Sequence, residues 1–201
     1  MRHEVRLDGL AYRIRPAEAP DAAFILSLRT SDRAAGTLHP VSGRLEDQLA
    51  WQRAYEARPD DWYWIVERLN GEPEGTIGIY DVDRVAGSGE WGRWILQPGS
   101  MAAPESSLLV YRAAFDVIGL AAVTALTVAT NAPVLSFHDR AGLERIGLVP
   151  GAFDLGGTRV DAIRHRLTRE RWAATRETLE RGAAGVAAML ARGAGGVADY
   201  S

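Results

Sequence analysis

The residues best suited to chemistry lie in the middle of the chain. Glu90 opens the aromatic stretch Glu-Trp-Gly-Arg-Trp, and His138 follows within a short amphipathic segment. A carboxylate can act as a general base toward an amine, and an imidazole can donate a proton near neutral pH. The two side chains therefore indicate acid–base chemistry. On the residues alone, a surface ion pair for Glu90 and a core contact for His138 are equally good interpretations.

Between these two residues, the stretch from Leu96 to Ala103 predicts a strand that turns directly into a helix. The first N–H groups of a helix lack partners and favour an anion. Gly99 lets the backbone approach a ligand, Ser100 adds a hydroxyl, and Ala102 keeps the first turn slim. A phosphate could reach these amides. The alternative is an ordinary helix start with Ser100 as its N-cap.

The remaining chain must supply the elements that position these groups. Hydrophobic periodicity and turn residues predict their order along the sequence. Strands are expected over 10–17, 62–68, 76–83, 89–96 and 122–130, and a final glycine-turn hairpin over 155–158 and 161–167. Helices are expected over 16–29, 45–57, from the Gly99 turn to 118, over 132–141 and over 168–190, with a loop at 30–42 and a frayed end from 192.

This order predicts a mixed α/β domain with a largely antiparallel sheet and one crossover helix. The crossover should bring the strand bearing Glu90 beside the strand that ends at Asn131. A cleft is then expected at the C-terminal ends of the two strands, with Glu90 on one wall and His138 on the other.

Strand periodicity also predicts which side chains share a face near Glu90. Alternation places Glu90, Gly92 and Trp94 on one face, and Trp91 and Arg93 on the other. Gly92 is expected to leave open space beside the carboxylate.

Five segments, in this order and spacing, resemble those of a known family. They are "RPAEAPDA", "EPEGTIGIYDVD", "GEWGRWI", "AFDVIGL" and "ATNAPVLSFHDRAGL". From Tyr12 to about Leu167 the chain resembles the GNAT (GCN5-related) N-acetyltransferases, in the branch with the ribosomal-protein and amino-sugar-nucleotide acetyltransferases.

The resemblance implies a mostly antiparallel sheet flanked by helices, with a splayed central strand pair. It implies acetyl-CoA as co-substrate and a primary amine as acceptor, with Glu90 as base and His138 at the position of the family's tyrosine acid. Because the chain has no cysteine, transfer should be direct within a ternary complex. No metal is expected. Residues 1–167 would form the acetyltransferase domain, and residues 168–201 a C-terminal helix and flexible tail.

The resemblance also assigns the residues that would hold acetyl-CoA. The backbone of the turn would cradle the pyrophosphate, Asn131 would lie by the pantetheine arm, and Arg140 near the phosphates. The turn residues in question are Leu96, Gln97, Gly99, Ser100, Met101, Ala102 and Ala103. Pro98 and Met101 depart from the family pattern, so a ligand-binding module without turnover is an alternative.

The acceptor is less defined by the sequence. His39, Tyr80 and Trp91 are candidates for contact with it, since aromatic faces stack on sugars and bases, although a core position is the competing interpretation. A small molecule such as a nucleotide-linked amino sugar is the leading expectation. A protein N-terminus and an aminoglycoside-type antibiotic are the alternatives.

Composition limits the other partners. The 201 residues are 47% hydrophobic, which predicts one compact domain, a monomer or a homodimer. The net charge is −3 without a basic run, so nucleic acid is not expected as a partner. Without a long apolar stretch, the sequence predicts a cytoplasmic protein that does not engage a membrane.

Overall fold

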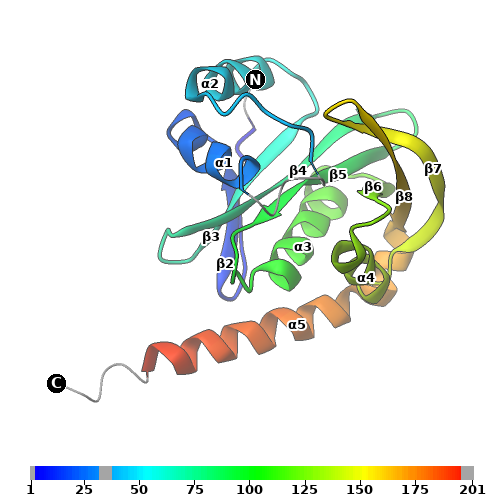
Figure 1. The fold of residues 1–201 in the computed structure, drawn as a ribbon. Coiled ribbons are helices and arrows are strands. Elements are labelled where there is room, and N and C mark those ends of the chain that lie inside the picture. The colour runs from blue at the N-terminus through cyan, green and yellow to red at the C-terminus, as the bar shows by residue number, and fades with distance from the viewer. Residues whose placement is uncertain (1–2, 32–37, 196–201) are drawn as a thin grey trace.

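A single mixed sheet organises the computed structural model, which describes residues 3–31 and 38–195 (Figure 1). Within these residues the sheet has eight strands in the order β1-β2-β3-β4-β5-β6-β8-β7. The strands are β1 (Leu7–Asp8), β2 (Tyr12–Pro16), β3 (Trp62–Arg68), β4 (Pro73–Asp83), β5 (Ser88–Leu96), β6 (Ala122–Val128), β7 (Glu144–Leu155) and β8 (Thr158–Thr168). Only the β5–β6 pair is parallel, which confirms the expected mostly antiparallel α/β class.

Helices cover both faces of this sheet (Figure 1). They are η1 (Ala19–Asp21), α1 (Ala22–Arg29), α2 (Leu45–Glu56), α3 (Ala103–Arg112) with a π-turn at Ala113–Val117, α4 (Ala132–Arg140) and α5 (Arg169–Gly195). None of the helices within the described ranges is long and apolar enough to cross a membrane.

The alternation of β3 explains why both faces are covered. Its side chains point by turns to opposite sides of the sheet. Trp64 and Val66 join the larger core beneath α3 and α5, whereas Tyr63 and Ile65 join a smaller core beneath α1 and α2. A strand buried on both faces in this way fixes the middle of the sheet.

Four features of the fold differ from the sequence expectation. Helix α1 begins at Ala22, after the short η1, whereas a helix from Pro16 was expected, and Pro16 ends β2. The short β1 was not expected, and β7 is a full strand that begins at Glu144 rather than a piece near Leu155. Two register shifts in the β7–β8 ladder, next to Gly147 and Gly151, hide the strand periodicity. Helix α5 is continuous to Gly195, so the expected fraying from residue 192 is wrong as far as Gly195. The tail 196–201 and loop residues 32–37 lie outside the described residues.

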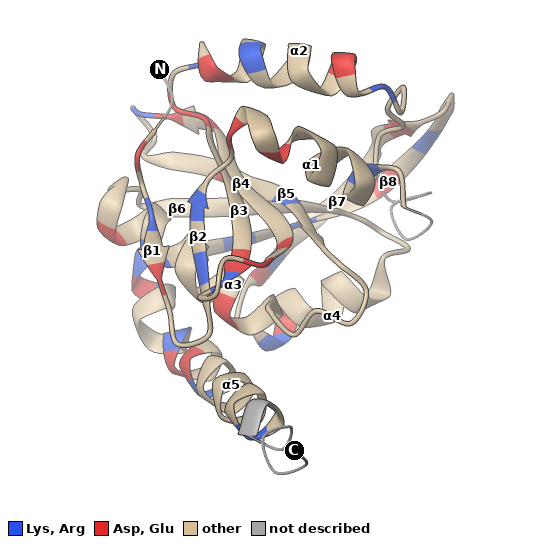
Figure 2. Ribbon diagram, turned by 90° about the vertical axis from the view of Figure 1, so that its left-hand side faces the viewer, with Lys and Arg blue, Asp and Glu red and all other residues tan. Residues whose placement is uncertain are grey.

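The glycines of α5 do not stop the helix because its inner face is buried. Trp172, Leu179 and Ala183 belong to the larger core. At Gly182 a Cβ would stand 3.0 Å from the Cβ of Pro104, so the missing side chain lets α5 approach the start of α3 closely. The outer side of α5 carries acidic and basic residues (Figure 2).

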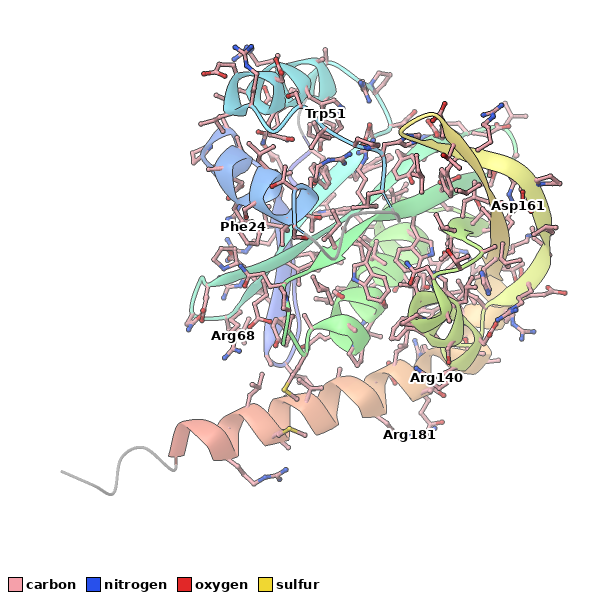
Figure 3. All side chains as sticks on the ribbon, in the orientation of Figure 1. Phe24, Trp51, Arg68, Arg140, Asp161 and Arg181 are labelled. Atoms are coloured by element: carbon pink, nitrogen blue, oxygen red, sulfur yellow. The ribbon has the colours of Figure 1, made fainter. Side chains whose placement is uncertain are left out.

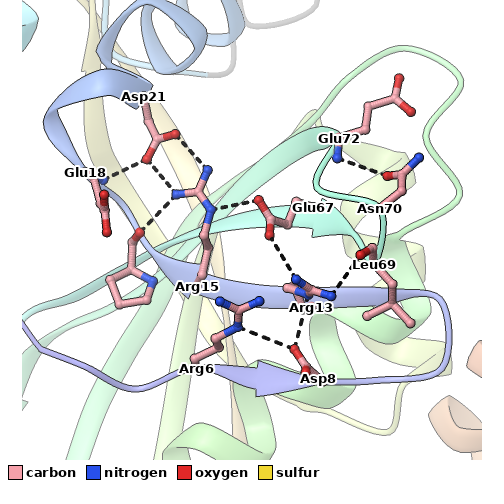
Figure 4. A network of polar contacts seen from close by, with 11 residues as sticks. Arg6, Asp8, Arg13, Arg15, Glu18, Asp21, Glu67, Leu69, Asn70 and Glu72 are labelled. Carbon is pink, nitrogen blue, oxygen red and sulfur yellow. Dashed lines mark hydrogen bonds and ion pairs between the residues drawn. The ribbon is translucent and has the colours of Figure 1, made fainter.

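A closed polar network ties β2, η1 and β3 together (Figure 4). The Arg15 guanidinium donates to both carboxylate oxygens of Asp21, at 2.8 and 2.9 Å, and its Nε donates to Glu67 at 2.7 Å. Arg13 lies 3.7 Å from the other oxygen of Glu67. Every charge in this group faces an opposite one, and the network lies far along the sheet order from the β5–β6 pair.

Candidate active site

The β5 and β6 strands pair over only three positions and then part. Ser88 to Glu90 are in register with Ala122 to Thr124. Beyond that point β5 continues to Leu96 and β6 to Val128 without a ladder between them. This confirms the predicted crossover and the splayed strand pair. Glu90 stands at the last paired position, where the opening begins.

Two adjoining cavities occupy this opening. One, of about 220 Å³, is lined by Glu90, Tyr80 and His138, among others. The other, of about 410 Å³, lies toward the starts of α3 and α4. The two cavities share Trp94, Asn131 and other residues, so together they form one elongated cleft.

Glu90 is held by a single hydroxyl group. The Tyr80 hydroxyl donates to Glu90 Oε1 at 2.9 Å. Burial raises the pKa of the Glu90 carboxyl above its ordinary value, although the Tyr80 hydrogen bond acts in the opposite direction. Burial also raises the pKa of Tyr80, so its proton stays on the phenol. A carboxylate with a raised pKa is a better proton acceptor than an exposed one.

The predicted alternation of side chains is correct up to Gly92 and wrong from Arg93 onward. Arg93 has φ of 51°, and the β4–β5 register shifts at this point. Such a bulge adds one residue to the strand and reverses the faces that follow. The Trp94 ring therefore lies 5.6 Å from Trp91, on the other face from Glu90. The Arg93 guanidinium lies 4.4 Å from the Tyr80 ring centre, on the Glu90 side.

The open space predicted beside Glu90 is filled. A Cβ at Gly92 would stand 2.4 Å from the Tyr80 hydroxyl oxygen. Gly92 therefore makes room for the tyrosine that holds Glu90, and not for a ligand.

An ion pair stands behind Tyr80. Arg93 donates to both oxygens of Asp61, one at 2.9 Å, and also lies against the rings of Trp51 and Tyr63 at 5.3 and 5.4 Å. Trp51 comes from α2, on the face opposite α4 (Figure 3). Sequence reasoning missed this group, because nothing in the spacing of Asp61 and Arg93 predicts that they pair.

His138 lies on the cleft wall but is enclosed. It is 2% exposed, and its ring centre lies 5.1 Å from that of Trp91 and 5.0 Å from that of His165. Burial, together with His165, lowers the pKa of His138 to about 3. The imidazole is therefore neutral at physiological pH. It can donate a hydrogen bond, but it is not an imidazolium ready to release a proton, and this limits the acid role expected from sequence.

The two other acceptor candidates differ in access. His39 is exposed at the mouth of the cleft, with its ring edge-on to Phe153 at 6.0 Å. Trp91 is only 2% exposed and packs against Tyr111 at 5.4 Å. Its ring forms the floor of the cleft, so little of it is available for stacking on a ligand.

The turn before α3 forms part of the far end of the cleft. Leu96, Ser100 and Ala103 line the larger cavity there, with Asn131 and Arg140 opposite. These five residues thus line one cavity, and their contact with acetyl-CoA stays a prediction. Arg140 lies on α4 (Figure 3).

Several amides of this turn already have partners. The N–H groups of Gln97, Ser100 and Ala102 donate to Glu74 O, Gln97 O and Ser100 Oγ, at 2.8, 3.1 and 3.2 Å. Ser100 Oγ in turn donates to Glu74 at 2.6 Å, while the N-cap position belongs to Ala102. The alternative with Ser100 as N-cap is therefore wrong by two residues.

Gly99 is exposed at the turn, next to the cavity-lining Ser100, although it does not itself line the larger cavity. Its φ is 82°, a left-handed conformation that favours glycine, and an added Cβ would meet no atom within 4 Å. Ala102, by contrast, is fully buried, and Met101 does not line the cavity. The residues present thus fit an anionic, elongated molecule, with open backbone at the turn and the cationic Arg140 opposite.

Three further cleft residues were missed by the sequence analysis. Phe153 and Leu155 come from β7, whose bulges hid the strand, and Arg29 ends α1 at the mouth. Arg29 carried no signal in the sequence beyond its charge.

Among the described residues, no group of three or more His, Asp or Glu side chains could hold a metal ion.

Comparisons with known proteins agree with this geometry. The profile of a family described as "Acetyltransferase (GNAT) domain" matches residues 12–144. No curated protein sequence matches the chain.

Among solved structures, the chain is similar to FdhC, described as a nucleotide-linked sugar GNAT, with 27% identity and a TM-score of 0.75 over 90% of this chain and 99% of that one. A GCN5-related N-acetyltransferase from Brucella melitensis is 18% identical, with a TM-score of 0.77 over 89% of this chain and 85% of that one. A mutant of the spermidine N-acetyltransferase SpeG from Vibrio cholerae is 15% identical, with a TM-score of 0.71 over 80% and 95% of the two chains. The last two show the fold alone.

Proposed function

Because the chain belongs to the GNAT acetyltransferase family and is an N-acetyltransferase, we propose that it moves the acetyl group of acetyl-CoA directly to a primary amine of a small molecule. The acceptor in this proposal is a nucleotide-linked amino sugar. The observation that carries the proposal is the position of Glu90. This carboxylate is held by Tyr80 at the closed end of the splayed strands, at one end of the cleft that reaches the α3 turn.

Glu90 is the base in this proposal. It takes one proton from the acceptor ammonium, directly or through a water, and leaves a neutral amine. The amine nitrogen then forms a bond to the thioester carbon while the carbon–sulfur bond breaks. The second proton lost from the nitrogen restores the thiol of CoA. The raised pKa of Glu90 favours the first of these transfers.

His138 serves in the same scheme as a neutral hydrogen-bond donor near the sulfur. An imidazole with a pKa of about 3 is not protonated at neutral pH, so donation of a hydrogen bond replaces release of a proton. The unpaired edge of β5 beyond Glu90 offers backbone N–H groups that can polarise the thioester oxygen.

The larger cavity is the proposed place for the CoA portion. The amide of Ala103, at the start of α3, would bind pyrophosphate oxygens, with the Ser100 hydroxyl nearby and the exposed backbone of Gly99 at the edge of the cavity. Arg140 would add a positive charge, and Asn131 would lie along the pantetheine arm. The path of the turn would be shaped by Leu96, Gln97, Met101 and Ala102. The amides of Gln97 and Ala102 already donate to Glu74 O and Ser100 Oγ.

The charges at the mouth of the smaller cavity favour an acceptor with an anionic part. Among the described lining residues Glu90 is the one carboxylate, Arg93 is already paired with Asp61, and Arg29 is the other cationic side chain. A polyamine such as spermidine would need several carboxylates to balance its charges. Arg29 would instead meet a phosphate while the sugar amine reaches Glu90, with His39 and Tyr80 beside it. This supports the nucleotide-linked sugar over the polyamine.

Two alternatives follow from specific observations. The exposed mouth around His39 would also admit a protein N-terminus or an aminoglycoside-type amine. A binding module without turnover would rest on Pro98 and Met101, which depart from the phosphate turn that the family resemblance implies. In each case residues 1–167 hold every described cleft residue, so we propose them as the functional domain, with 168–201 as a supporting segment.

Calorimetric titration with acetyl-CoA and with CoA tests the first half of the proposal. Micromolar binding is expected, weakened by Arg140→Ala. Thiol release is then measured with a nucleotide-linked amino sugar, spermidine and a peptide as acceptors. Turnover with the sugar alone supports the proposal. Turnover only with spermidine or the peptide would overturn the acceptor class, and binding without turnover for any amine would favour the binding module.

A further inference from the structure

We propose that the ion pair between Arg93 and Asp61 is a positioning device for Glu90, which acts by fixing Tyr80 and by setting the electrostatic field at the carboxylate. The inference rests on the proposed function, because it takes Glu90 to be the base. It assigns a role to two residues that make no contact with the reacting atoms in the scheme above.

The contacts form a continuous chain. Asp61 holds the guanidinium of Arg93 through two hydrogen bonds, one of 2.9 Å. The guanidinium lies 4.4 Å from the centre of the Tyr80 ring, a distance typical of a cation–π contact. The Tyr80 hydroxyl donates to Glu90 at 2.9 Å. A shift of the arginine would therefore displace the ring that holds the carboxylate.

The backbone is distorted at the residue in question. Arg93 has φ of 51°, in the left-handed region that is unfavourable for a residue other than glycine. The bulge turns its side chain onto the Glu90 face, whereas regular alternation would have turned it away. The hydroxyl of Thr76 donates to the Arg93 carbonyl at 2.7 Å and so supports this conformation.

Burial makes the pair a costly choice for stability alone. The Arg93 and Asp61 side chains are 15% and 7% exposed, and removing two charges from water opposes their mutual attraction. Apolar residues could fill the same space beneath Trp51 and Tyr63. The retained charges are explained better by an effect on a neighbouring group, and Arg93 is one of the charged groups that act on Glu90.

Four groups shift the pKa of the Glu90 carboxyl, and the direction of each shift determines what a substitution should do. Asp81 from β4 raises its pKa, whereas Tyr80 from β4, Arg164 from β8 and Arg93 from β5 lower it. Removal of the Arg93 charge should therefore raise the pKa of Glu90. Removal of the Asp61 charge leaves Arg93 unbalanced, and this should lower the pKa of Glu90.

The experiment compares the acidic limb of kcat/KM against pH in Arg93→Met and Asp61→Asn, with one acceptor throughout so that its own ionisation cancels. The limb is expected to move to higher pH in Arg93→Met and to lower pH in Asp61→Asn, each on the order of one pH unit. Arg15→Met is the matched control: it removes a paired, partly buried arginine from β2, away from Glu90, and should leave the limb in place.

Shifts in the same direction, or no shift in either variant, would overturn the electrostatic role. Circular dichroism and melting temperature show whether each variant folds. If Arg93→Met does not fold, Arg93→Lys replaces it: this variant keeps the charge but loses the two-pronged bond. It should leave the limb near its original pH and lower kcat without changing KM for acetyl-CoA, and an unchanged kcat would refute the positioning role.

The proposed function fails in a different way. An acidic limb that survives in Glu90→Gln would show that Glu90 is not the base.

Discussion

Two arginines on separate strands of the sheet, Arg15 on β2 and Arg93 on β5, are both paired with aspartate, yet their surroundings differ. Arg15 on β2 bonds Asp21 and Glu67, and Arg13 closes the group from the other side. Arg93 on β5 bonds Asp61 but then faces three aromatic rings, with Tyr80 leading on to Glu90. In the first group every charged side chain is paired with another of opposite charge. The second group leads to the Glu90 carboxylate, which accepts one hydrogen bond, from Tyr80, and lines a cleft.

The regularity of the strand pairing also differs between the two regions. The β2–β3 ladder around Arg15 is in continuous register. The β4–β5 ladder shifts at Arg93, and the β5–β6 ladder stops at Glu90. The β3–β4 ladder also shifts at Glu67, so a bulge alone does not distinguish the two regions. What distinguishes Glu90 is that β6 parts from β5 beside it and leaves the carboxylate facing a cleft. Substitutions of the same type in the closed network and in the cleft should therefore have different effects on stability and on activity.

The largest difference is expected between two glutamates, the half-buried Glu90 in the cleft and the buried Glu67 in the closed network. Glu90→Gln should lower kcat about 100- to 10,000-fold, because it removes the general base, and leave the Kd for acetyl-CoA unchanged. Glu67→Gln in the closed network should lower the melting temperature and leave kcat within a few fold. Steady-state kinetics and thermal melts make the comparison, and wild-type turnover in Glu90→Gln would eliminate the distinction between the two regions.

A smaller loss is expected when the room for Tyr80 is removed. In Gly92→Ala the new methyl group would stand 2.4 Å from the Tyr80 hydroxyl oxygen, so the tyrosine must leave Glu90. We expect kcat to fall on the order of tenfold to hundredfold. Gly185→Ala, in open space on α5, is the control and should keep full activity, with a melting temperature unchanged or raised. Equal activity of both variants would show that the Tyr80 contact is unimportant.

Tyr80→Phe keeps the ring over Arg93 and removes only the hydroxyl. The hydrogen bond to Glu90 favours the charged carboxylate, so its loss should raise the Glu90 pKa and move the acidic limb of kcat/KM upward by about one pH unit. The plateau rate should change less than in Gly92→Ala. A downward movement of the limb would contradict the assigned sign.

The smallest effect is expected at the far end of the cleft. Arg140→Ala should raise KM for acetyl-CoA about fivefold, because one partly exposed charge contributes little, and the effect should shrink with added salt. KM for the acceptor should stay constant. Arg192→Ala, on the outer side of α5, is the control. A larger change in acceptor KM than in acetyl-CoA KM would move Arg140 out of the proposed CoA end.

The regular half of the fold followed from the sequence more closely than the cleft did. The limits of β3 and α2 agreed closely with their hydrophobic patterns, since each is long and periodic. The splay at Glu90 followed from the crossover rule and from the family resemblance. Strand β7 was missed because bulges interrupt its periodicity.

The details of the cleft depend on backbone irregularity that no pattern of residue types reveals. The bulge at Arg93 reversed the predicted faces, so Trp94 and Arg93 exchanged sides. Gly92 was expected to leave open space beside Glu90, but the Tyr80 hydroxyl fills that space. His138 was placed on the wall correctly, whereas its neutral state follows from burial against Trp91 and His165, which only tertiary structure supplies.

The pH dependence of kcat/KM in wild type and Glu90→Gln tests the central claim most directly. Glu90 must be unprotonated to act as base, and burial raises its pKa, so activity should fall with decreasing pH through a midpoint above the ordinary carboxyl range. The account predicts that this acidic limb is present in wild type and absent from the residual activity of Glu90→Gln. The same limb at the same midpoint in both proteins would contradict it.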